Sequence, residues 1–177
     1  MPTLRPLRDT DSLVELTALL HAAYASLAAQ GWNFTAVNQP VDVTRQRLAD
    51  AQAFVAERDG RLVGTVAVRG PKPVGETYIG DETPQLYTTP GTAILAQLGV
   101  HPDCRGLGLG ERLIEAAEGW ARAQGFTQIA LDTAEPATAL RQRYERRGYR
   151  TVGGVQWQGK TYASVLMVKP LAPETTA

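Results

Sequence analysis

The sequence contains a single cysteine, Cys104, among its 177 residues. One cysteine excludes an intramolecular disulfide framework and is typical of a reducing compartment. No apolar run approaches the roughly 20 residues that a membrane-spanning helix needs, and Met1–Arg5 is not followed by the apolar core of a signal peptide. We therefore expect a soluble, cytoplasmic protein.

The chain also has no excess of charge of either sign. Its 18 Lys and Arg residues balance its 18 Asp and Glu residues, so we expect neither a nucleic-acid partner nor a membrane surface, and only a local basic patch stays open. No spacing of His, Cys, Asp and Glu indicates a metal site. With 44% hydrophobic residues and no internal repeat, the sequence predicts one domain over residues 1–170 and a short tail, 171–177.

The most informative stretch runs from Ile94 to Gln124. An apolar run of strand length, Ile94–Val100, leads into a loop with alternate glycines, Arg105-Gly106-Leu107-Gly108-Leu109-Gly110. Apolar residues then recur at intervals of three and four, the spacing of an amphipathic helix. This stretch predicts a strand, a glycine-rich loop and a helix in succession.

The start of such a helix attracts anions, because its first N–H groups lack intrahelical partners and carry partial positive charge. Gly106, Gly108 and Gly110 would let the backbone approach a phosphate oxygen and adopt positive φ. Arg105 can add a charge-assisted contact. The expected ligand is a pyrophosphate.

The other patterns predict a mixed α/β fold with an antiparallel front half and a parallel crossover in the middle. Before the central unit, the chain order is a strand at 3–8, a helix from 13, a short helix near 43–51 and a hairpin at 54–68 around an Asp-Gly turn. After it come a strand at 128–133, a helix that has Pro136 in its first turn and ends at Gly148, and a final hairpin. The long segment 70–91 is either a functional lid or a disordered insertion. Trp32 and Phe34 either form part of an acceptor wall or pack beneath a loop.

Spacing separates three phosphate-binding interpretations of the loop. A nucleotide P-loop fails, because Gly110 is followed by Glu111 and Arg112. A dinucleotide fingerprint has Asp132 at about the right separation for a ribose-binding acid, but lacks the small residue where helix meets strand. The third interpretation fits: Arg105–Gly110 resembles the Q/R-x-x-G-x-G/A signature of the GNAT superfamily, the acetyl-CoA-dependent N-acyltransferases.

A second segment, Leu140–Tyr149, is similar to the A/L-x-x-x-Y-x-x-x-G-F/Y segment of the same family, and the resemblance covers roughly residues 3–170. It implies a twisted, mostly antiparallel sheet of about seven strands with four flanking helices and a splayed central parallel pair. It also implies acetyl-CoA as the cofactor and Tyr144 near its sulfur, as general acid for the departing thiolate. Packing against Leu140 is the alternative role of Tyr144.

The resemblance further implies that backbone groups of Leu98, Gly99 and Val100 bind the pantetheine arm and polarise the thioester carbonyl. Arg105, Gly106, Leu107, Gly108, Leu109 and Gly110 would hold the pyrophosphate. Many relatives carry a glutamate base on this strand, where the present chain offers only Gln97. A water path, Glu76, Asp81, Glu82 or an already neutral amine are the open alternatives.

These features predict an N-acetyltransferase that transfers acetyl from acetyl-CoA to a primary amine of a small molecule or peptide, by direct attack in a ternary complex. His101 is expected to be a loop residue, and no acyl-enzyme is expected at Cys104. Tyr78, Tyr87, Trp157 and Tyr162 are further candidates for aromatic walls. Two alternatives are a non-catalytic acyl-CoA-binding module and a longer acyl donor, and a homodimer stays open.

Overall fold

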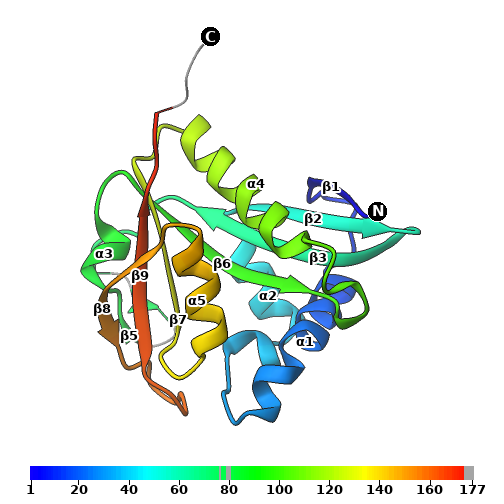
Figure 1. Ribbon diagram of the computed structural model, residues 1–177, viewed down its shortest axis with the longest axis horizontal. Helices are drawn as coiled ribbons and strands as arrows, with labels where there is room; N and C mark the ends of the chain where they lie inside the picture. Colours follow the sequence, from blue (N-terminus) through cyan, green and yellow to red (C-terminus); the bar gives the residue numbers. More distant parts are fainter. Residues whose placement is uncertain (76, 79–80, 174–177) are drawn as a thin grey trace. The chain divides into compact units, whose positions relative to one another are not determined.

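The computed structural model describes residues 1–75, 77–78 and 81–173 (Figure 1). Seven strands form one sheet in the order β1-β2-β3-β6-β7-β9-β8. Their bounds are β1 Thr3–Pro6, β2 Gln52–Arg58, β3 Arg61–Arg69, β6 Thr92–Val100, β7 Gln128–Ala134, β8 Arg150–Val155 and β9 Ser164–Pro170. The pairs β1–β2, β2–β3, β7–β9 and β8–β9 are antiparallel, whereas β6–β7 is parallel. This confirms the predicted mixed sheet.

The parallel pair is short. Its ladder joins Thr92, Ala93 and Ile94 of β6 to Gln128, Ile129 and Ala130 of β7, although both strands continue. From Leu95 onward, β6 has no register partner in β7 within the described residues, while β7 pairs with β9 along its whole length. The central pair therefore separates after three residues, as expected for a splayed pair.

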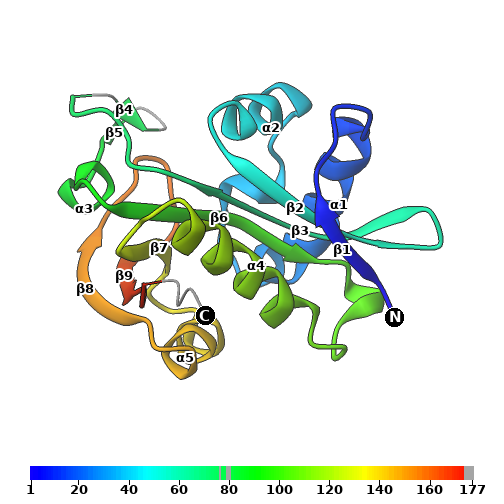
Figure 2. The same ribbon diagram turned by 90° about the horizontal axis from the view of Figure 1, so that it is seen from above.

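The chain divides into two compact units, which are described separately. The first comprises Met1–Arg69 and Leu95–Gly119. Helices α1 (Leu13–Ala29) and α2 (Val41–Leu48) lie on one side of β2 and β3, and α4 (Leu109–Ala123) begins on the other (Figure 2). Short 3-10 helices span Thr35–Val37 and Pro102–Cys104.

Two apolar clusters fill the two sides of this unit. One holds Leu16 and Leu19 of α1 against Val55 and Leu62, and the other holds Leu109 of α4 against Ala56, Cys104 and Val100. The hairpin between β2 and β3 turns at Asp59 and Gly60, with φ of 53° and 76°. Positive φ at both turn residues is what an Asp-Gly hairpin turn requires, so the predicted turn is confirmed.

The second unit comprises Gly70–Ile94 and the chain from Trp120 on. Besides β7, β8 and β9 it contains the two-stranded β4 (Thr77–Tyr78) and β5 (Asp81–Glu82), the one-turn helix α3 (Gln85–Thr88) and α5 (Thr138–Arg146). Its core contains Tyr87, Ile94, Ala130, Trp157, Leu166 and Val168.

Segment 70–91 is folded onto this core over its described residues. Tyr87 is only 1% exposed and its backbone carbonyl accepts a bond from Lys72 N (2.8 Å), while Asp81 Oδ2 accepts one from Gln158 N (2.7 Å). A disordered insertion is therefore the wrong interpretation for the described part. A lid function stays a prediction.

Three element predictions need correction. Within the described part of the chain, α3 is a fifth helix where four were expected. Pro136 precedes α5 instead of lying in its first turn, because Ala137 N bonds Ala134 O and makes a separate turn before Thr138. Helix α4 begins at Leu109, since Arg112 N already bonds Gly108 O (3.1 Å), so Gly110 lies inside the helix.

Among the helices of the described residues, none is both long and apolar enough to cross a lipid bilayer.

Candidate active site

The glycine-rich loop has the predicted positive φ at Gly106 and Gly108, but not at Gly110, which lies inside α4. Gly106 and Gly108 have φ of 80° and 74°, a region that side chains with a Cβ rarely adopt. Apart from its two chain neighbours, a Cβ placed on either glycine would have no described protein atom within 4 Å. Residues Arg105–Gly108 are exposed. The loop is therefore open to an external ligand, and alternating glycines of this kind can aim successive N–H groups at an anion.

The loop is anchored at both ends. Leu109, the first residue of α4, is 2% exposed and packs in the core beside Ala56 and Cys104. At the other end, Arg105 Nη2 donates to the carbonyl of Ala23 in α1 at 2.8 Å. This bond holds an exposed guanidinium beside the loop while leaving its other N–H groups available, since a guanidinium has five.

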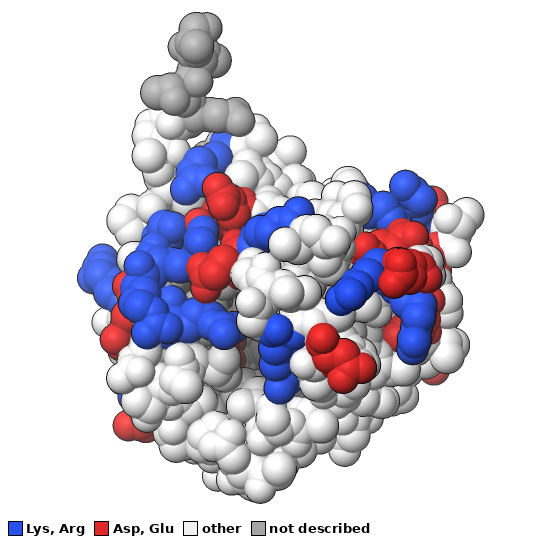
Figure 3. Space-filling view, turned by 45° about the vertical axis from the view of Figure 1, so that its right-hand side comes forward, with Lys and Arg blue, Asp and Glu red and all other residues white. Residues whose placement is uncertain are grey.

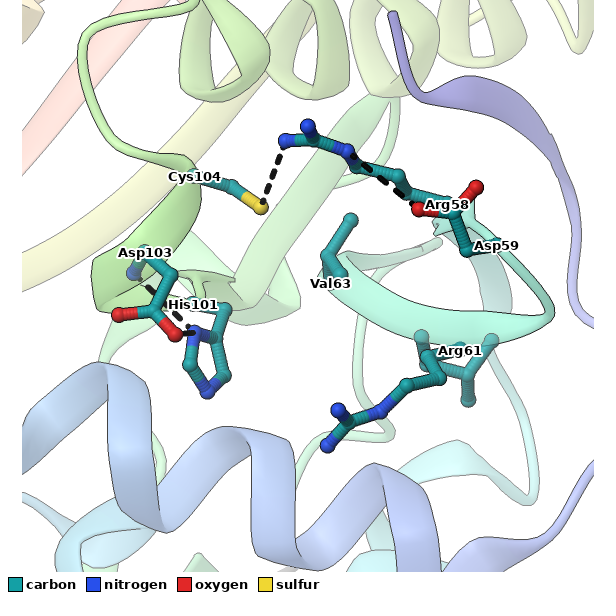
Figure 4. Close-up of a pocket in the computed structure, with 8 residues that line it drawn as sticks. Arg58, Asp59, Arg61, Val63, His101, Asp103 and Cys104 are labelled. Atoms are coloured by element: carbon teal, nitrogen blue, oxygen red, sulfur yellow. Dashed lines mark hydrogen bonds and ion pairs between the residues drawn. The ribbon is translucent and has the colours of Figure 1, made fainter.

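His101 and Cys104 have structural roles. His101 Nδ1 accepts a bond from Asp103 N (3.1 Å) and so caps the 3-10 helix at Pro102–Cys104. Cys104 is 4% exposed, with Arg58 Nη1 4.0 Å from its sulfur. Both residues line a cavity of about 220 Å³, in which the His101 ring points away from the Cys104 sulfur (Figure 4). The arrangement lacks the Cys–His pair in which a histidine serves as the base of a cysteine nucleophile.

The strand β6 beyond Ile94 carries the three predicted pantetheine-binding residues. A Cβ on Gly99 would lie 3.0 Å from Ala23 Cβ and 3.6 Å from the Tyr24 ring, so α1 packs directly on the strand backbone there. Val100 packs in the α4-side cluster. Leu98 is partly exposed. The close approach of α1 explains why position 99 holds glycine.

Gln97 stands where many relatives are expected to have a glutamate. It is 6% exposed, has an unusual φ of 55°, and accepts a bond from Gln39 Nε2 at 2.9 Å. A primary amide is not a base under ordinary conditions. The side chain at this position therefore does not remove the amine proton directly.

Tyr144 lies in α5 and is 7% exposed. Its ring contacts that of Tyr149 edge-on, with centroids 5.7 Å apart and planes at 67°.

Five arginines stand in or just after α5, at 141, 143, 146, 147 and 150. Figure 3 shows a dense group of Lys and Arg side chains on the face that it draws, so a local basic patch is present despite the balanced net charge.

Asp132 is a further site candidate, which the sequence indicated only as a ribose-binding acid in the dinucleotide interpretation. It is a partly exposed residue of β7, and its carboxylate accepts bonds from the Tyr87 hydroxyl and from Trp157 Nε1, the latter at 2.9 Å. No ion pair to Asp132 occurs within the described ranges. An acid in the apolar strand sequence Gln-Ile-Ala-Leu-Asp was the available signal.

The other base candidates fare differently. Asp81 is bonded to the Gln158 backbone, Glu82 is exposed in β5, and Glu76 lies outside the described residues. Several proposed wall aromatics are core residues instead: Tyr87, Trp157 and Tyr162 are 1%, 3% and 8% exposed. The side chain of Tyr78 lies outside the described part.

Phe34 packs on α1, because its ring centroid is 5.7 Å from that of Tyr24. This contact favours packing beneath a loop over an acceptor wall for Phe34. Trp32 is partly exposed, and its role stays a prediction.

Comparison with known proteins agrees with this geometry. S-(2-succino)cysteine N-acetyltransferase of Bacillus subtilis (strain 168) is 29% identical over 166 residues, which cover 93% of this chain and 92% of that protein. Several other curated relatives are longer, and the chain spans less than half of their length.

Solved structures show the same fold. The ribosomal-protein-S18-alanine N-acetyltransferase from Escherichia coli has a TM-score of 0.72 and 16% identity, over 99% of this chain and 97% of that one. A GNAT family acetyltransferase from Elizabethkingia anophelis with acetyl-CoA bound has a TM-score of 0.65 and 13% identity, over 96% and 98%. The model of the acetyltransferase (GNAT) family matches residues 17–149, most of the chain. The chain therefore belongs to the GNAT family of acetyltransferases.

Proposed function

We propose that the protein transfers an acetyl group from acetyl-CoA to a primary amine, by direct attack within a ternary complex. The open glycine-rich loop carries this proposal. Its glycines at 106 and 108 have left-handed φ and open space where a Cβ would stand, so the start of α4 presents a bare backbone surface that suits a diphosphate. The expected contact with the diphosphate is thus made by the backbone of this loop.

In this proposal the six residues from Arg105 to Gly110 hold the pyrophosphate. Arg105 adds positive charge, and its bond to Ala23 O fixes the guanidinium close to the loop. Leu98, Gly99 and Val100 contribute backbone groups to the pantetheine arm and to the thioester carbonyl. Strand β6 has these groups available because its ladder with β7 ends at Ile94.

The reaction forms a C–N bond between the amine and the acetyl carbonyl carbon and breaks the C–S bond of the thioester. The amine nitrogen loses one proton and the thiolate gains one. Tyr144 is the proposed donor to the sulfur, since a phenol with a pKa near ~10 in small reference compounds can protonate a thiolate. Cys104 has no part, because it is buried and the His101 ring, which lines the same cavity, points away from its sulfur (Figure 4).

Asp132 is the proposed acceptor of the amine proton. It belongs to the same unit as Tyr144, and two neutral donors, Tyr87 and Trp157, hold its carboxylate in one orientation. A carboxylate has about four lone-pair sites, so others are left for a substrate. A partly exposed carboxylate without an ion pair among the described residues fits a positively charged or proton-losing partner.

The acceptor is a primary amine of a small molecule or peptide. The names of the Bacillus subtilis and Escherichia coli relatives specify a cysteine derivative and an alanine, so amino acids belong in the first acceptor panel. A cytoplasmic location and a homodimer stay predictions of the sequence.

Gln97 in place of a glutamate favours one alternative, a non-catalytic module that binds acyl-CoA. Thiol release from acetyl-CoA, measured against a panel of amines and amino acids, separates the two. A transferase releases thiol in proportion to an acetylated amine, whereas a binding module binds CoA and releases none above background. Donor competition with longer acyl-CoA thioesters tests the acyl chain.

A further inference from the structure

A buried polar network connects α1, α2 and β6 in the first unit. Gln39 and Thr44 are 2% and 0% exposed, and Thr17 and Gln97 are 3% and 6% exposed. Gln39 Nε2 donates to Thr44 Oγ1 (2.8 Å) and to Gln97 Oε1 (2.9 Å), and Gln39 Oε1 accepts from Arg47 Nη1 (2.9 Å). Four polar side chains are thus removed from water and bonded to one another.

The groups at the two ends of this network determine which atom donates and which accepts in each of its hydrogen bonds. Arg47 can only donate, so the oxygen of the Gln39 amide must face it and the nitrogen must face the other way. At the far end the Thr17 hydroxyl donates to Leu13 O (2.7 Å). Its single hydrogen is used there, so Thr17 must accept from Thr44 at 2.7 Å. Thr44 in turn accepts from Gln39.

The orientation of the Gln97 amide follows. Because Gln39 presents an NH₂ group, a reversed Gln97 would place donor against donor. Gln97 must therefore direct Oε1 to Gln39 and keep Nε2 for another partner. Within the described residues Nε2 has no hydrogen-bond partner, and the fully enclosed unsatisfied atoms of that part are Arg141 Nε, Arg147 Nε and Ser164 Oγ. Nε2 is thus open to a partner from outside.

The backbone at Gln97 adds an independent observation. Its φ of 55° is left-handed, a conformation that costs free energy for a residue with a side chain and that clusters at functional sites. The residue lies in the part of β6 beyond the β7 ladder. A nearly buried amide is thus kept in a strained position with its donor group unused.

We propose that Gln97 Nε2 donates to a carbonyl or carboxylate oxygen next to the amine of the acceptor, which makes the acceptor an α-amino acid or an α-aminoacyl group. This inference rests on the proposed acetyl transfer. The partners of Gln97 come from α2 and from the connection that precedes it. Figure 2 shows α2 on the side of β2 and β3 opposite to α4, whose first turn is the proposed diphosphate site. The bond from Gln39 holds the Gln97 side chain on that side as well, away from the proposed diphosphate site.

The test uses three acceptors with the same side chain: an α-amino acid, its carboxamide and the amine without the carboxyl group. The wild-type protein should prefer the first two over the third. Gln97→Glu keeps the shape and the bond from Gln39 but replaces the donor with an acceptor. It should lower kcat/KM for the amino acid and the carboxamide, relative to the plain amine, by about tenfold or more. Any effect of the new carboxylate as a base acts on all three amines alike and leaves this ratio unchanged.

Gln39→Glu is the matched variant, because residue 39 is too deeply buried to touch the substrate. A glutamate there accepts from Arg47 and from Gln97 Nε2, which turns Gln97 Oε1 outward. The same loss of preference should follow, mainly as a higher KM. Gln97→Asn, which keeps a shorter donor, should recover part of the preference.

The outcomes are distinct. An unchanged preference among the three acceptors in Gln97→Glu, whether their kcat/KM values rise, fall or stay the same, overturns the assignment. A weaker CoA affinity in calorimetry with unchanged acceptor preference places the contact on the cofactor and also overturns it. If the wild-type protein neither binds CoA nor releases thiol with any acceptor, the proposed transferase function itself fails.

Discussion

The proposed role of Tyr144 depends on one atom, its hydroxyl oxygen. Tyr144→Phe removes the hydroxyl and keeps the ring contact with Tyr149. If the phenol protonates the departing thiolate, kcat should fall by about a hundredfold, within the usual range for a general acid, while the Kd for CoA stays the same. Steady-state kinetics together with calorimetry measure both.

Tyr149→Phe is the matched control, because it removes a hydroxyl from the partner ring, which is 2% exposed. It should leave kcat within about twofold of wild type, as expected of a side chain that acts by packing. An unchanged kcat in Tyr144→Phe would show that Tyr144 only packs in the core.

The charge of Asp132 can be tested apart from its hydrogen bonds. Asp132→Asn removes the charge and should lower kcat by about tenfold to a hundredfold, because the amine proton loses its acceptor. Trp157→Phe removes the 2.9 Å bond to Oδ2 but keeps the carboxylate. It should lower the midpoint of thermal unfolding and retain most of kcat.

The kcat values of Asp132→Asn and Trp157→Phe are measured below the unfolding temperature of each variant. The CoA affinity of both variants is measured alongside as a control for folding. Equal losses of kcat in both variants would show that Asp132 acts only by holding Tyr87 and Trp157 in place. That result would remove it from the proposed chemistry.

At the scale of elements, an ion-pair cluster joins β1, β2 and the start of α1. Arg5 Nη1 and Nη2 each donate to Asp11 at 2.8 Å, and Arg5 Nε donates to Glu57 at 2.9 Å. The bonds from Arg5 lower the pKa of Asp11 from 3.8 to about 2. A carboxylate with a lowered folded-state pKa stabilises the fold above its unfolded pKa and loses that effect as the pH falls through the folded value.

Asp11→Asn should therefore lower the free energy of unfolding by about 1 kcal/mol at pH 7, because solvent screens a pair so near the surface. The difference from wild type should shrink as the pH falls below about 4. Urea unfolding of both proteins between neutral and acidic pH measures it. A difference that is the same at every pH would show that the Asp11 charge contributes nothing to stability.

Segment 70–91 has no hydrophobic periodicity of its own, and bonds to distant residues hold it in place. Tyr87, in the one-turn helix α3, bonds Asp132 across 45 positions of sequence, and Asp81 bonds the Gln158 backbone across 77. Proline and glycine patterns indicate turns but contain no information about such distant partners. The state of this segment could therefore not be decided from its sequence.

For the whole molecule, the sheet and most helices could be predicted, because period-two and period-3.6 patterns and the Asp-Gly turn are local signals. The glycine-rich loop could also be predicted, since positive φ at Gly106 and Gly108 depends on the residues themselves. The Asp132 cluster and the bond between Gln39 and Gln97, 58 positions apart, could not. They depend on tertiary contacts between residues far apart in the sequence, and no local pattern specifies the partners.

The most direct test of the account is calorimetry of CoA with the wild-type protein, Gly108→Val and Gly119→Ala. A valine cannot easily adopt φ of 74°, whereas Gly119 lies within α4 and has open space around a Cβ. We predict that the wild type and Gly119→Ala bind CoA alike, and that Gly108→Val binds at least about tenfold more weakly. Absence of binding to the wild type, or equal affinity in all three proteins, would contradict the proposal that this loop holds the diphosphate.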